Sequence, residues 1–73
     1  MDVRQLLYFT PIVEEGRISA AAKQLHLSQP PLSHQLKLLE EELNLQLVQR
    51  GPRCITLTDA GRLLYKRAQS ILS

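Results

Sequence analysis

The sequence predicts a mainly α-helical domain with one short β-hairpin. Apolar residues recur at helical spacing in most of the chain, and they alternate only between residues 47 and 57. The chain has 73 residues, which suffices for a single small core. Its longest apolar run, Leu6 to Phe9, is far shorter than the roughly 20 residues that span a bilayer. Cys54 is the only cysteine, as is typical of a reducing compartment, so we expect a cytoplasmic protein without a membrane segment.

The first predicted helix begins after Asp2. Asp2 can act as the N-cap, and Gln5 stands where a capping box needs its second partner. Gly16 is a suitable stop, because glycine adopts the left-handed conformation that ends many helices. Pro11 lacks the amide donor of an interior helical residue and restricts the residue before it, so we expect a kink or a break near Thr10.

A tight corner of two helices is predicted next. Ser19 is the expected cap of a helix of about two turns, and the alanines behind it allow another helix to approach closely. The third helix is expected to begin around Pro30 or Pro31, since the first turn tolerates proline. One face of this helix is an apolar stripe and the opposite face is polar. The stripe consists of Leu32, Leu36, Leu39 and Leu43, and the polar face of Pro30, His34, Lys37 and Glu41.

A hairpin and a last helix complete the prediction. Alternation on both sides of Gly51-Pro52 predicts two short strands, with Ile55 and Leu57 facing inward. Thr58 is the expected cap of the last helix. No glycine or proline follows to stop this helix, so we expect the chain to continue in the natural protein.

Charge is distributed unevenly along the chain. Residues 1–43 contain four basic and six acidic residues, whereas residues 44–73 contain five basic residues and one acidic residue. A basic segment favours a polyanion such as nucleic acid, although many basic segments are only solvated surface.

Catalytic and metal-binding interpretations are weak. Ser33 and His34 are neighbours in the sequence, but they stand about 100° apart around a helix and have no third orienting group. The run Glu40 to Glu42 resembles a solvated helix end more than a paired acid and base. Cys54, His26 and His34 match no ligand spacing for zinc. We therefore expect neither an enzyme nor a cofactor in this domain.

Together these elements predict a winged helix-turn-helix over residues 1–58, followed over residues 59–73 by the start of a further helix. A helix with an apolar back and a polar front suits the major groove of DNA, where first-turn side chains reach base edges. The alternative is a helical dimerisation module whose basic hairpin is incidental, because a fold does not fix a function.

Three blocks of the sequence resemble one known family, the LysR-type transcriptional regulators. The blocks are Arg4-Gln5-Leu6 with Tyr8-Phe9 and Glu14-Glu15-Gly16, then AAAKQLHLSQPPLSHQLK at residues 20–37 with Leu39-Glu40 and Glu42-Leu43, then Leu57-Thr58-Asp59-Ala60-Gly61. The resemblance implies the amino-terminal domain of such a regulator, which binds promoter DNA as a homodimer, with a tetramer possible in the full-length protein. It also implies that a small-molecule co-inducer binds only the effector domain that would follow.

The resemblance and the predicted elements together suggest the site. The recognition helix, about residues 30–43, is expected in the major groove, and the wing, about residues 48–57, on the backbone or in the minor groove. The expected DNA-binding residues are Ser28, Gln29, Pro30, Pro31, Ser33, His34, Lys37, Arg50 and Arg53. The expected dimerisation residues are Leu63, Leu64, Ile71 and Leu72, because they form an apolar surface wider than one small domain can cover. A two-fold dimer would read an inverted repeat.

The expected roles differ among these residues. Gln29, Ser33 and His34 are assigned to base edges, and Lys37 to the sugar-phosphate backbone. Prolines in the first turn would leave the hydroxyl of Ser28 without its cap bond, so this hydroxyl is available to phosphate. Pro30 either touches a thymine methyl or only shapes the start of the helix. The alternatives are that Gln29 binds nearby main chain and that the hairpin arginines are merely solvated.

Of the departures from the family pattern, the one at His34 bears most on these roles. The family usually has arginine in place of His34 and glycine in place of Asn44. Arginine grips a guanine edge with two hydrogen bonds, whereas imidazole offers one, so the base preference at that position is expected to differ.

Overall fold

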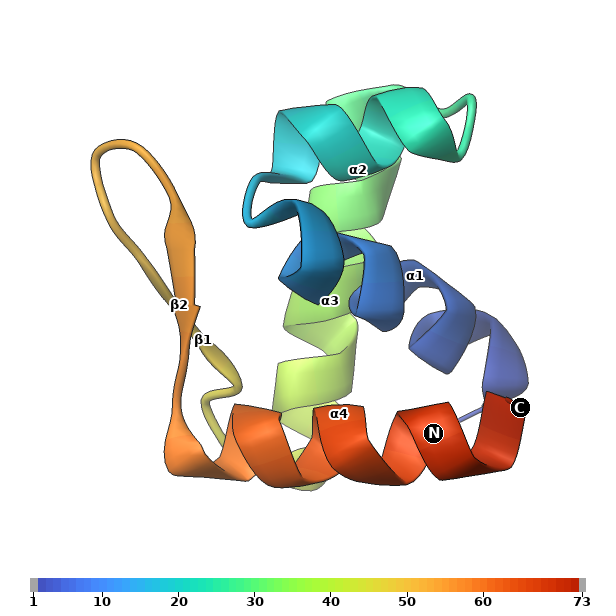
Figure 1. Ribbon diagram of the computed structural model, residues 1–73, viewed down its shortest axis with the longest axis vertical. Helices are drawn as coiled ribbons and strands as arrows, with labels where there is room; N and C mark the ends of the chain where they lie inside the picture. Colours follow the sequence, from blue (N-terminus) through green and yellow to red (C-terminus); the bar gives the residue numbers. More distant parts are fainter. Residues whose placement is uncertain (1, 73) are drawn as a thin grey trace.

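Three helices form the core, a two-stranded hairpin stands on one side of it, and a fourth helix lies across one end (Figure 1). The computed structural model describes residues 2–72, so Met1 and Ser73, the outer ends of the two predicted segments, lie outside the described residues. The elements are α1 (Val3–Glu15), α2 (Ile18–Gln24), α3 (Gln29–Leu43), β1 (Val48–Arg50), β2 (Ile55–Leu57) and α4 (Asp59–Leu72). The predicted mainly helical, winged fold is confirmed.

The ends of α1 are those that the sequence predicts, but its interior is not. The Gln5 amide donates to Asp2 Oδ1 at 2.9 Å and the Asp2 amide donates to Gln5 Oε1 at 3.1 Å, which completes the capping box. Gly16 ends the helix in the left-handed region with φ 74°. Of the predicted kink or break near Thr10, the break is wrong, because α1 continues through Pro11. The Pro11 ring is buried, and its burial offsets the loss of one main-chain hydrogen bond.

The predicted cap of α2 at Ser19 is also wrong. The N-cap is Arg17, which is extended at φ −146° and ψ 139°, and the helix begins at Ile18. Because Gly16 has already turned the chain, one extended residue is enough to start the next helix. The earlier start places Ile18 in the core, where it is 9% exposed, and leaves Ser19 on the surface.

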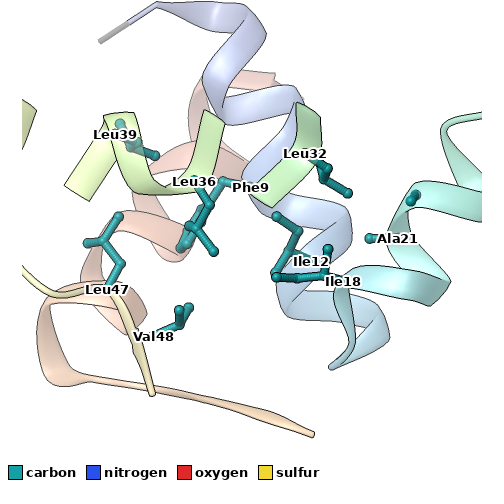
Figure 2. Close-up of a cluster of buried hydrophobic side chains, with 10 residues drawn as sticks. Phe9, Ile12, Ile18, Ala21, Leu32, Leu36, Leu39, Leu47 and Val48 are labelled. Carbon is teal, nitrogen blue, oxygen red and sulfur yellow. The ribbon is translucent and has the colours of Figure 1, made fainter. Parts of the chain in front are cut away.

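The core forms where α1, α2 and α3 meet the first strand (Figure 2). The leucine stripe of α3 is buried at three of its four positions, and Leu43 is half-buried. Ala21 and Ala22 are buried against the core, which confirms that small residues let α2 approach closely. The largest side chains that are fully buried are Phe9, Ile12, Leu32, Leu39 and Leu47.

The end of α3 needs a left-handed residue. Asn44 occupies the C-cap with φ 54° and ψ 38°. Asparagine is one of the few side chains that tolerate this conformation, which explains how it can stand where the family usually has glycine.

A carboxylate joins the end of α3 to the first strand of the hairpin. Glu40 Oε2 accepts a hydrogen bond from the Leu47 amide at 2.7 Å and another from the Val48 amide at 3.3 Å. The interpretation of Glu40 as part of a solvated helix end is therefore wrong. Glu41, its neighbour, is exposed as predicted.

The second strand is fixed to the corner between α1 and α2. Arg50 pairs with Ile55 in the antiparallel register, and the Ile55 amide donates to the Gly16 carbonyl at 2.7 Å. Ile55 and Leu57 are half-buried against the core, which confirms their inward orientation. The hairpin is thus held by main-chain contacts outside its own ladder.

The start of α4 packs closely on the loop before β1. Thr58 Oγ1 accepts from the Gly61 amide at 3.0 Å, which confirms the predicted cap, and it donates to the Gln46 carbonyl at 2.6 Å. A Cβ added at Gly61 would lie 2.0 Å from the Leu47 carbonyl oxygen. Only glycine permits this approach.

The other half of α4 is joined to α1. The Tyr65 hydroxyl donates to Glu14 Oε2 at 2.9 Å. This hydrogen bond raises the pKa of Tyr65 above its usual value of 10.0, and partial burial and the negative charge of Glu14 act in the same direction. Within residues 2–72, no helix has the length and apolar character needed to cross a bilayer.

Candidate nucleic-acid interface

The helix α3 begins with an unusual first turn. Ser28 is the N-cap, and Pro30 and Pro31 occupy the second and third helical positions, where amides would otherwise receive a cap bond. Within the described chain the Ser28 hydroxyl makes no cap hydrogen bond, as the sequence predicts. Ser28, Gln29, Pro30 and Pro31 are all exposed, so this turn presents its side chains outward.

The turn lies at the end of the molecule that α4 does not cover. In Figure 1 the start of α3, the helix α2 and the tip of the hairpin are all directed to the same end, while α4 lies at the opposite end. A groove of about 250 Å³ separates the hairpin tip from the helices. Its lining includes Gln29 and Ser33 from α3 and Arg50 and Arg53 from the hairpin. The structure therefore brings these four predicted site residues together.

Five predicted residues do not line this groove: Ser28, Pro30, Pro31, His34 and Lys37. His34 is exposed on α3 but does not line the groove. Lys37 lines a separate hollow of about 400 Å³, which it shares with Glu40 and Glu41. Carboxylates so close to Lys37 reduce the attraction that its charge exerts on a polyanion.

Sequence reasoning missed residues from the corner between α1 and α2. Arg17 and Ser19 line the groove together with the hairpin residues. They also line a hollow of about 550 Å³ along α2, together with Lys23 and Gln29. Arg17 belongs to the half of the chain with a net negative charge, and only the bond between Ile55 and Gly16 reveals that it lies beside the basic hairpin.

The electrostatic character of the groove is uniform. Its three charged lining residues are Arg17, Arg50 and Arg53, and none of the described residues that line it is acidic. Ser19, Gln29 and Ser33 add hydrogen-bonding side chains to the same surface. The groove can therefore attract an anionic strand and bind its phosphates and base edges.

The predicted dimerisation residues are unequally exposed on α4. Leu63 and Ile71 are each 57% exposed, whereas Leu64 and Leu72 are half-buried. A mainly apolar hollow of about 240 Å³ lies beside the first two of these leucines, lined by Leu43, Leu45, Leu47, Ala60, Leu63, Leu64 and Arg67. No cluster of three or more His, Cys, Asp or Glu side chains in the described part of the chain is arranged to hold a metal ion.

Comparison with known proteins identifies close relatives over the whole chain. The probable cat1 operon transcriptional activator of Acinetobacter lwoffii is 47% identical over 72 residues, which are 99% of this chain and 24% of the relative. The HTH-type transcriptional regulator BsdA of Bacillus subtilis strain 168 is 52% identical over 73 residues, with 99% of this chain and 25% of the relative covered. The chain thus spans about a quarter of the length of these relatives.

Solved structures agree in fold. The crystal structure of the BenM_DBD/catB site 1 DNA complex has a TM-score of 0.95 and 44% identity, over 99% of this chain and 81% of that one. BenM is an HTH-type transcriptional regulator of Acinetobacter baylyi. The crystal structure of the CbnR_DBD–DNA complex has a TM-score of 0.95 and 46% identity, over 99% of this chain and 83% of that one.

The match to a family model covers most of the chain. Residues 3–62 fit the family model described as bacterial regulatory helix-turn-helix protein, lysR family. The similar proteins are named as transcriptional regulators and not as enzymes, in agreement with the prediction. The resemblance seen in the sequence is therefore confirmed, and this chain belongs to the LysR family of bacterial regulatory helix-turn-helix proteins.

Proposed function

We propose that this chain is the sequence-specific double-stranded DNA-binding domain of a LysR-type transcriptional regulator. The observation that carries the proposal is the groove, in which side chains from the first turns of α3 face hairpin arginines and no described lining residue is acidic. The similar BenM_DBD and CbnR_DBD structures are DNA complexes, which supports DNA binding by this fold. In the proposed orientation α3 enters the major groove and the wing contacts the adjacent backbone or minor groove.

The side chains that contact base edges belong to the first turns of α3. Gln29 is exposed and can form two hydrogen bonds with an adenine edge. Ser33 lies one turn later on the same groove wall and reaches either base type. His34 is exposed beside Ser33 and contacts a neighbouring base with a single hydrogen bond. Arg50 and Arg53 bind phosphate or the minor groove and add affinity with little sequence information.

Dimerisation through α4 completes the proposed function. Leu63 and Ile71 expose more than half of their surface, and burial of this surface against a second copy would contribute to association. Residues 59–73 then form the start of the linker helix, and a two-fold dimer places two copies of α3 on an inverted repeat. We further propose that a co-inducer binds a following domain, and that the protein acts in the bacterial cytoplasm.

The salt dependence of binding tests this function against a pure dimerisation module. A duplex enriched from a random library by the wild-type chain serves as the probe. For DNA binding, log affinity falls with log salt concentration, by about 0.9 for each phosphate contact. The double variant Arg50→Gln, Arg53→Gln should therefore flatten the slope by about two units. An affinity that does not respond to salt would instead support the dimerisation module.

A second measurement tests base reading. Gln29→Ala should cost about 1–3 kcal/mol on the enriched duplex and relax the preference at one base position. Gln69→Ala is the matched control, since Gln69 is an exposed glutamine of α4, which lies at the end of the molecule opposite the groove. Equal effects of the two substitutions would remove Gln29 from the base contacts.

A further inference from the structure

We propose that Arg17 is a third phosphate-binding arginine, which binds the DNA strand from the corner between α1 and α2, beside the wing. The inference rests on the proposed function and names a contact that the sequence reading did not include. Arg17 is exposed at the corner between α1 and α2, and it lines the groove together with Arg50 and Arg53.

The main chain fixes the position of Arg17 relative to the wing. Arg50 and Ile55 are register partners in the hairpin, and the Ile55 amide donates to the carbonyl of Gly16 at 2.7 Å. Arg17 follows Gly16 directly and is itself extended. The corner therefore runs beside β2, and the attachment points of the two arginines are held by hydrogen bonds instead of by flexible side chains.

The chemistry of the groove favours phosphate between these arginines. Three guanidinium groups line one small groove, and no acidic side chain among the described lining residues neutralises them. Their mutual repulsion is relieved when an anionic strand lies between them. A guanidinium also matches the geometry of a phosphate, with which it forms two parallel hydrogen bonds.

Arg17 also connects the groove to the surface of α2. Arg17, Ser19 and Gln29 line both the groove and the neighbouring hollow that Lys23 and Ser28 help to form. A strand that passes the wing therefore meets Arg17 close to the residue that reads a base. The contact holds the phosphate beside that base in place and adds affinity equally for all sequences.

Substitutions at Arg17 test the inference. Arg17→Gln should flatten the slope of log affinity against log salt by about 0.9, so its affinity relative to that of the wild-type chain should be roughly eightfold lower at 0.1 M salt than at 1 M salt. Arg17→Lys keeps the charge and should keep the slope. Arg4→Gln is the matched control, because Arg4 is exposed on α1 and lines none of the grooves described above. The base preference of Arg17→Gln, measured on single-base variants of the duplex, should remain that of the wild-type chain.

The outcomes separate this inference from the proposed function. If the wild-type chain binds the enriched duplex with a steep slope, and the wing variants flatten it while Arg17→Gln does not, the contact at Arg17 is refuted and the proposed function stands. If Arg17→Lys flattens the slope as much as Arg17→Gln does, the effect is not one of charge and the inference is also refuted. If the wild-type chain shows no salt-dependent binding, both fail together.

Discussion

Removal of the Glu40 carboxylate should destabilise the domain although the residue stands in an acidic run at a helix end. Its Oε2 accepts from the Leu47 amide at 2.7 Å and from the Val48 amide at 3.3 Å. A hydrogen bond to a charged group contributes about 1.5–3 kcal/mol, and the longer bond adds about 0.5–1 kcal/mol. Because Glu40 is only half-buried, water replaces part of this interaction in Glu40→Ala. We expect a net loss of about 2–3 kcal/mol.

The thermal midpoint gives a sensitive readout in a domain of this size. In small domains 1 kcal/mol shifts the midpoint by about 4–8 °C, so Glu40→Ala should lower it by about 10–20 °C in circular-dichroism melting. Glu40→Gln keeps one acceptor oxygen without its charge and should lose about half as much free energy of unfolding. Glu41→Ala, at an exposed position of the same helix end, should change stability by less than about 0.5 kcal/mol. Equal melting of the two alanine variants would refute the role assigned to Glu40.

Three further predictions follow from other contacts. Gly61→Ala should destabilise the domain by about 1–3 kcal/mol in urea unfolding, because the new Cβ meets a carbonyl oxygen. This loss is expected although alanine favours helix over glycine by about 1 kcal/mol. Unchanged stability would contradict the close approach. The hydrogen bond with Glu14 raises the pKa of Tyr65, so its stabilising effect should be complete below pH about 10 and lost as the pH rises through the higher folded-state value. The melting difference between the wild-type chain and Tyr65→Phe should therefore shrink in strong alkali, and a constant difference would argue against the bond. His34→Arg should strengthen the preference for guanine at one position by about 1–3 kcal/mol on single-base variants of the duplex, and an unaltered preference would remove residue 34 from the base contacts.

Features with a local cause could be predicted from the sequence. The capping box of Asp2 with Gln5 depends on residues three apart, and the left-handed stop at Gly16 depends on a single residue. The same holds for the first turn of α3, where two prolines leave Ser28 without its cap bond. The prediction that α3 is the recognition helix rests on these local signals together with the leucine stripe.

Features with a tertiary cause could not be predicted in the same way. In the sequence Glu40 cannot be distinguished from its acidic neighbours, because only the fold brings the amides of Leu47 and Val48 beside its carboxylate. Arg17 is far from the hairpin in sequence, and the bond between Ile55 and Gly16 brings the two segments together. The start of α2 was misplaced for a related reason, since burial of Ile18 in the core outweighs the capping preference of the residue after it.

The anchors of the wing bear on how the interface binds DNA. β1 is held at its base by Glu40, and β2 is held beside Arg50 by the carbonyl of Gly16. A wing that is fixed before binding loses little conformational entropy when its arginines engage phosphate, so more of the electrostatic gain appears as affinity. The Gly16 anchor is close to the groove, since Gly16 adjoins Arg17. The Glu40 anchor is farther from it, because Glu40 of α3 binds the amides at the start of β1. Loosening the Glu40 anchor should therefore weaken DNA binding at every sequence without altering the base preference.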